Sequence, residues 1–100
     1  MLNSGNWGDS AYSDFDRKKV MEIQEGSVVV EIFEKPDTQN NRLFFDLTIQ
    51  REYILRDSRE KKRGPYLHQR DMGDSVIALM SAQKWINGRV REFRSNQQED

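Results

Sequence analysis

The sequence predicts an α+β domain: a curved antiparallel sheet of three to four strands packed by one long C-terminal helix, in the order β-β-β-β-α. Residues 42–56 alternate between apolar and polar side chains, which is the period of a half-buried strand. Residues 71–93 instead carry apolar side chains at helical spacing. A chain of 100 residues fits one domain. Strands followed by one helix therefore favour a two-layer arrangement.

The first strands are expected between residues 20 and 36. The segment "GSVVVEIFEKP" at 26–36 is rich in β-branched residues and is bounded by glycine and proline, as strands are. A shorter strand is expected around 20–23, and "DTQNN" at 37–41 has the composition of a turn. Successive side chains of a strand point to opposite faces of the sheet. In the 26–36 strand, one face therefore carries Val28, Val30 and Ile32, and the other carries Val29, Glu31, Phe33 and Lys35.

Residues 42–56 are expected to form one long strand, bent or coiled, or broken near Gln50, because few strands exceed ten residues. Arg51 interrupts its apolar face. Residues 57–65 read as a turn and 66–70 as the returning strand. The core-facing side chains predicted here are Leu43, Phe45, Leu47, Ile49, Tyr53 and Leu55, joined by Leu67.

The helix is expected to begin at Asp74, whose carboxylate can accept the free amides of the first turn. Asn87-Gly88 either ends the helix or is a tolerated weak point that costs ~1 kcal/mol. Because one helix covers a four-stranded sheet only in part, we expect a homodimer. The predicted core stripe consists of Val76, Leu79, Met80, Ile86, Val90 and Phe93.

The ends of the chain are expected to be disordered tails, at 1–17 and 95–100, around a single domain at 18–94. The aromatic residues of the first tail, Trp7, Tyr12 and Phe15, either pack loosely or dock on the domain or a partner. No segment approaches the ~20 apolar residues of a membrane span. We therefore expect no membrane partner, and the cytoplasm is the simplest compartment.

The composition argues against an enzyme. The chain has no cysteine, which excludes disulfides and thiolate chemistry, and His68 is its single histidine. It has no glycine-rich phosphate loop. Asp71 and Asp74 fit anions at a helix start better than a catalytic pair. We expect no catalytic site, metal, cofactor or small-molecule substrate.

Charge is distributed unevenly along the chain, although the net charge is only −1. Residues 1–41 hold eight acids and four bases, whereas residues 42–70 hold four acids and eight bases. Cations that follow phosphates and rings that stack on unpaired bases are what single-stranded nucleic acid requires. The candidate nucleic-acid-binding residues are Phe33, Arg42, Phe44, Arg51, Arg56, Arg59, Lys61, Lys62, Arg63, Tyr66, His68 and Arg70.

Two short segments resemble the single-stranded-DNA-binding fold of the Pur-alpha proteins and the positive-cofactor-four transcriptional coactivators. "NNRLFFDLTI" resembles the aromatic strand of a Pur repeat, and "REYILRDSREKKRG" at 51–64 resembles the coactivator ribbon. The resemblance covers about residues 26–94. It implies a dimer that binds single-stranded DNA or RNA along a sheet and its ribbons. It also implies that Arg51, Arg63 and the turn lysines form the cationic ribbon, with Phe44 as an exposed ring.

The functional expectation is a non-catalytic module that binds single-stranded DNA or RNA, with a transcription-related role implied by the resemblance. Two main alternatives stay open, and an enzyme that uses His68 is a distant third. A charged hairpin tip can be plain solvated surface that prevents aggregation. The outer rings, Phe33 and Phe44, can instead belong to a protein-interaction or structural dimerisation domain.

Overall fold

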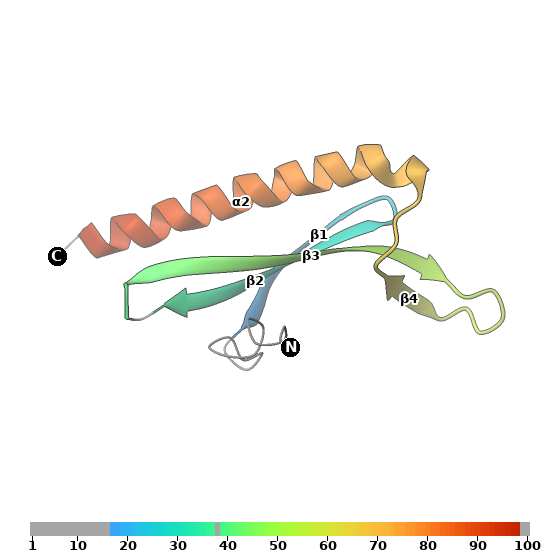
Figure 1. The fold of residues 1–100 in the computed structure, drawn as a ribbon, viewed down its shortest axis with the longest axis horizontal. Coiled ribbons are helices and arrows are strands. Elements are labelled where there is room, and N and C mark those ends of the chain that lie inside the picture. Colours follow the sequence, from blue (N-terminus) through green and yellow to red (C-terminus); the bar gives the residue numbers. More distant parts are fainter. Residues whose placement is uncertain (1–16, 38, 99–100) are drawn as a thin grey trace, which may run out of the picture.

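The computed structural model, which describes residues 17–37 and 39–98, contains a four-stranded antiparallel sheet followed by a C-terminal helix. The strands lie side by side in chain order, and the helix runs along one face of the sheet (Figure 1). This confirms the predicted α+β arrangement. The elements are β1 (Lys18–Glu25), β2 (Val28–Asp37), β3 (Arg42–Ile54), β4 (Lys61–Gly64), the 3-10 turn η2 (Gln69–Asp71) and α2 (Met72–Gln98).

The core lies between β2 and α2. Val28, Val30 and Ile32 of β2 are fully buried against Ala78 and Ala82 of α2. The alanines lack long side chains, so the helix can lie close to the sheet. Partly buried side chains surround this centre, namely Val20, Met21, Ile23, Phe45, Ile49, Trp85 and Ile86.

The turn between β1 and β2 also contacts the helix. Gly26 has a φ of +59°, a left-handed conformation that glycine adopts without a steric penalty. A Cβ atom at this position would collide with the carboxylate of Asp74 in the first turn of α2. The turn therefore favours glycine for its backbone conformation, and a larger residue would also have to displace the Asp74 side chain.

The predicted helical stripe is wrong in its first half. Val76, Leu79 and Met80 are 57 %, 44 % and 65 % exposed, while Ala78 and Ala82 face the sheet. The sequence pattern favoured the larger apolar residues, but only small ones fit where the helix approaches β2 closely. The helix lies mainly over β1 and β2 and less over β3. Its second half agrees with the prediction, since Ile86, Val90 and Phe93 are half-buried.

Both ends of the helix differ from the expectation. The helix begins at Met72, so Asp74 lies inside the first turn and is not the N-cap. Asn87-Gly88 lies within the helix, as the weak-point alternative allowed. The helix continues to Gln98, past the expected domain boundary at 94. The first tail lies outside the described residues up to position 16, as do Trp7, Tyr12 and Phe15.

The returning strand is β4, at 61–64, and not residues 66–70 as predicted. Pairing with β3 ends where Gly64 lies opposite Arg51, and the next residue, Pro65, has no amide to donate. β3 itself continues through Gln50 without a break. The predicted core positions beyond the sheet centre are also wrong, since Tyr53, Leu55 and Leu67 are 41 %, 38 % and 37 % exposed.

Candidate nucleic-acid interface

The sheet face opposite α2, here called the outer face, holds the two predicted rings. Lys35 pairs with Phe44 and Phe33 pairs with Asp46, at positions that alternate with the core residues of β2. Phe44 is 39 % exposed, and Phe33 is half-buried. Strand periodicity therefore assigned both rings to the correct face of the sheet.

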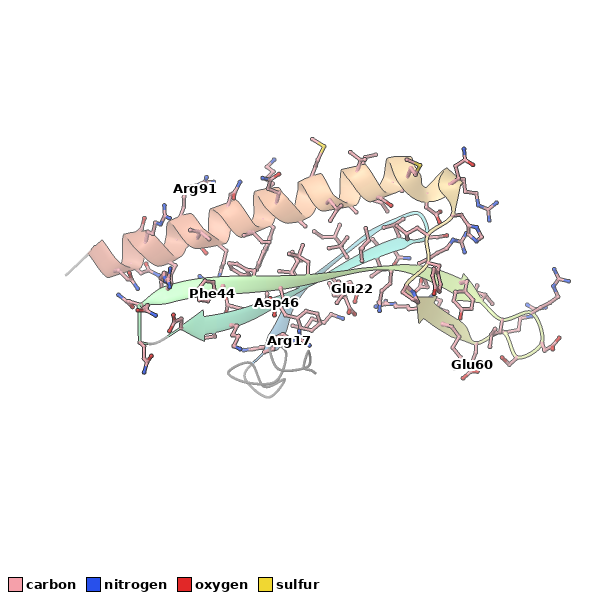
Figure 2. The ribbon with its side chains drawn as sticks, viewed as in Figure 1. Arg17, Glu22, Phe44, Asp46, Glu60 and Arg91 are labelled. Atoms are coloured by element: carbon pink, nitrogen blue, oxygen red, sulfur yellow. The ribbon has the colours of Figure 1, made fainter. Side chains whose placement is uncertain are left out.

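β3 and β4 form a ribbon that projects past the start of the helix (Figure 1). We call residues 52–64 the distal ribbon. A turn closes it, in which the Leu55 amide donates to the Glu60 carbonyl at 2.9 Å. Between residues 53 and 62 the ribbon carries four exposed cations and two acids, Asp57 and Glu60, and Glu60 lies near its tip (Figure 2). These cations are Arg56, Arg59, Lys61 and Lys62.

Tyr66, His68 and Arg70 follow the distal ribbon in the segment that leads to α2. All three are exposed, and Tyr66, at 86 %, has the most accessible large ring within residues 17–37 and 39–98. Asp71 holds this segment in place, because its carboxylate accepts the His68 amide at 2.9 Å. The segment is therefore not a strand, but it presents an exposed ring two residues after the end of β4.

Arg51 lies on the opposite side of the sheet from the outer face. Its Nε donates to the Asp71 carboxylate at 2.8 Å, and its side chain is only 13 % exposed. The His68 amide, and then Arg51, hold the pKa of Asp71 below its usual range. The positive charge of Arg51 is thus neutralised inside the molecule, where it joins β3 to the start of the helix.

Arg63 belongs to an ion cluster on the outer face. Its guanidinium donates to Glu22 and Glu31, each at 3.0 Å, and to Glu52 at 3.3 Å. Lys19 also donates to Glu22 at 2.6 Å and to Glu31 at 3.1 Å. The cluster thus holds three carboxylates and two cations, and it connects all four strands.

The cluster makes stability depend on pH. Hydrogen bonds from Arg63, and then from Lys19, lower the pKa of Glu22 from 4.5 to about 2. A lowered carboxyl pKa stabilises the fold fully above the unfolded value, and this contribution is lost as pH falls from 4.5 towards 2. Urea unfolding of the wild type and Glu22→Gln should differ by roughly 1 kcal/mol or less at pH 7. The difference should shrink on acidification.

Glu60→Gln, outside the cluster, is the control for this prediction. A wild-type advantage over Glu22→Gln that stays constant between pH 7 and pH 2.5 would contradict it.

The remaining predicted residues lie at the other end of β3. The Arg42 guanidinium stacks over Phe44, 5.1 Å from the ring centre, and Arg17 stacks over Phe33 at 5.0 Å. A strand rise of ~3.3 Å per residue separates Arg42 from Ile54 by roughly 40 Å. The predicted site thus divides into this proximal group and the distal ribbon group.

Sequence reasoning missed the three clustered glutamates, Glu22, Glu31 and Glu52. Alternation along the 26–36 strand placed Glu31 on the same side as Phe33 and Lys35, so its position in the alternation was the available signal. Within residues 17–37 and 39–98, no group of His, Cys, Asp or Glu has an arrangement that could hold a metal ion. No helix in that part of the chain is long and apolar enough to cross a membrane.

Comparison with protein-family models, curated proteins and solved structures gives no match for this chain. The contacts described above are therefore the basis for a functional proposal.

Proposed function

We propose that the protein binds single-stranded nucleic acid through its distal ribbon. The observation that carries the proposal is the placement of four exposed cations, Arg56, Arg59, Lys61 and Lys62, on a projecting ribbon that is followed two residues later by Tyr66, which is 86 % exposed. Cations that follow the phosphates beside a ring that stacks on a base form the usual single-strand platform.

Each group has a separate role in this proposal. The ribbon cations contact phosphates, which gives binding a steep salt dependence. Tyr66 stacks on one base, a contact worth ~1–3 kcal/mol. His68 and Arg70 extend the accessible surface towards the helix. Glu22, Glu31 and Glu52 neutralise Arg63, so the centre of the outer face attracts phosphate less than the ribbon does.

Replacing Arg56, Lys61 and Lys62 with serine should weaken binding of a labelled single-stranded oligonucleotide and flatten its salt dependence. Each lost phosphate contact reduces the slope of log K against log salt by ~0.7, so three contacts reduce it by about 2. Fluorescence anisotropy across ~50–300 mM salt measures both quantities. Arg59 is left unchanged because its φ of 61° is part of the turn.

The matched control removes three exposed cations elsewhere, with Lys18, Lys84 and Arg91 replaced by serine. We expect the control to keep most of the wild-type slope. Equal slopes in the two triple variants would move binding away from the ribbon. Absence of wild-type binding at ~50 mM salt, where phosphate contacts are strongest, would reject the nucleic-acid function itself.

A second candidate function, homodimerisation, is favoured by one apolar surface. We call this surface the open apolar face. Its residues are 43–65 % exposed, and they come from the helix-facing side of β3 and from α2, namely Leu47, Met72, Val76, Leu79 and Met80. Contiguous apolar surface of this kind marks interaction sites.

The open apolar face lies on the β3 side of the helix. Val90 lines a groove together with Leu43 and Phe44 of β3. Leu79 precedes Val90 by eleven residues, about three helical turns, and so lies on the same side. Since α2 covers mainly β1 and β2, the α2 helix of a second copy would cover the part of the sheet left open.

A further inference from the structure

One edge of the sheet is open along most of β3. On one side of this strand, β2 pairs with residues 42–51, and on the other side β4 pairs with residues 51–54 (Figure 1). Within residues 17–37 and 39–98, no strand pairs with the β4 side of residues 42–50. We call the β4 side of residues 42–50 the open edge.

The backbone groups along the open edge follow from the hydrogen bonds near its end. The Glu52 amide donates to the Ser27 carbonyl at 2.7 Å, so even-numbered residues of β3 direct their backbone groups towards β2. The Leu55 amide donates to Glu60, on the other side. Because the register of β2 and β3 is regular, this alternation continues back to Arg42. The backbone groups that point out of the open edge therefore belong to Leu43, Phe45, Leu47 and Ile49.

The other edges of the sheet have features that prevent strand addition, and the open edge does not. β1 carries Lys18 and Lys19 and has an irregular register between Lys19 and Met21, while β4 is only four residues long. Lysines, bulges and short strands are the usual protection of an edge. Residues 42–50 contain no lysine or proline, and their register with β2 has no bulge. The open edge is therefore suited to pairing with another strand.

The open edge also borders the open apolar face. The odd-numbered residues of β3 direct their side chains to the helix side of the sheet, where Phe45 contacts the ring of Trp85 and Leu47 is 43 % exposed. A strand added here would extend the sheet on the side that α2 covers least. One partner strand would thus pair the free backbone groups and cover apolar side chains at the same time.

The open edge is complementary to itself when two copies run antiparallel. If the pairing is centred on Phe45, Leu43 of one copy lies opposite Leu47 of the other on the helix side. On the outer face, Arg42 lies diagonally across from Asp46 of the second copy, within reach of its carboxylate. This complementarity of shape and charge favours a second copy of the chain as the occupant.

Other registers fit less well. Centring the pairing on Asp46 would place two like charges directly opposite each other, which is destabilising. Centring it on Leu47 would bring the first residues of β3 into the position where β4 of the second copy pairs with Glu52. The register centred on Phe45 avoids both conflicts and still forms about six backbone hydrogen bonds.

We propose that two copies of the chain join through their open edges, with the β3 strands antiparallel and centred on Phe45. The four strands of each copy then form one continuous sheet. The two-fold axis of such a pair is perpendicular to the sheet, so both helices lie on the same face with their β3 sides towards each other. This proposal specifies the homodimer inferred above and rests on it, and it does not use the distal ribbon.

Amide hydrogen exchange, followed by NMR at several protein concentrations, tests the pairing. We expect the amides of Leu43, Phe45 and Leu47 to exchange at least about tenfold more slowly in the dimer than in the monomer. The amides of Phe44 and Asp46 are the internal control, because they face β2 and should be protected at every concentration.

Disulfide cross-linking tests the register, since the chain has no native cysteine. Chains carrying Phe44→Cys are mixed with chains carrying Asp46→Cys and oxidised. In the proposed register these Cα atoms lie ~4.5 Å apart, which permits a disulfide, so the mixed covalent dimer should predominate. Gln50→Cys is the matched control, because it lies on the same face ~13 Å further along β3 and should not link to Phe44→Cys.

The proposal is overturned if the dimer leaves the odd-numbered amides of the open edge unprotected. It is also overturned if Gln50→Cys links to Phe44→Cys as readily as Asp46→Cys does. Either result would leave the homodimer in place with a different interface, whereas a chain that stays monomeric at high concentration would remove both. None of these results bears on oligonucleotide affinity, so the nucleic-acid proposal stands or falls separately.

Discussion

Replacing Ala78 with glutamate is expected to destabilise the fold by about 3–5 kcal/mol, the usual cost of an uncompensated buried charge. Ala78 is fully buried against Val28, Val30 and Ile32, with no room for a longer side chain. Small domains have ~5–15 kcal/mol of stability, so this single change removes a large part of it. Urea unfolding followed by circular dichroism measures the loss.

Ser81→Glu is the matched control, since Ser81 is exposed on the same helix and should change stability by about 0.5 kcal/mol or less. The comparison also tests how the helix is rotated about its axis. If the stripe of Val76, Leu79 and Met80 faced the sheet, Met80→Glu would be the damaging change and Ala78→Glu the mild one. That pattern would reject the observed packing.

Replacing Val76 and Met80 together with glutamate is expected to separate the proposed dimer without unfolding the protomer. Both side chains are more than half exposed, so the protomer core is unaffected. In a two-fold interface each change occurs twice, and like charges brought together across an interface cost several kcal/mol. A loss of about 3 kcal/mol raises the dissociation constant roughly 100-fold.

Sedimentation velocity over a range of protein concentrations measures this shift, and unfolding curves confirm that the variant is folded. Ser81→Glu with Ser95→Glu adds the same charge to exposed positions on another side of the helix and should leave the dimer intact. A wild type that stays monomeric at high concentration would exclude the dimer. Equal dissociation in both variants would indicate a general charge effect.

The strands and the helix could be predicted because the spacing of apolar residues that indicates each element is contained in a short stretch of sequence. Alternation in residues 42–56 located β3, and β-branched residues located β2. The buried face of the helix could not be predicted in the same way. The spacing of apolar residues predicts that large side chains such as Met80 face the core, but Met80 is exposed. Ala78 and Ala82 are buried instead, because the close approach of the helix to the sheet requires small side chains.

The candidate site was predictable only to the level of which face each residue occupies. The alternation of side chains along the strands assigned Phe33 and Phe44 to the correct face of the sheet. It could not show that Arg63 would meet Glu22, which is 41 residues away in sequence, or that Arg51 would meet Asp71. Ion pairs of this kind depend on the curvature of the sheet and on the position of the helix start, which no local pattern contains.

The order of the sheet has a consequence for how the chain folds. Each strand pairs with its neighbour in sequence, so each hairpin forms by closing a short loop. The packing of α2 on β1 and β2 joins more distant parts of the chain. Because local contacts form before distant ones in folding kinetics, we expect the transition state to contain the β2–β3 hairpin. We expect α2 to pack on the sheet in the last step of folding. The protein should become resistant to protease only after that step.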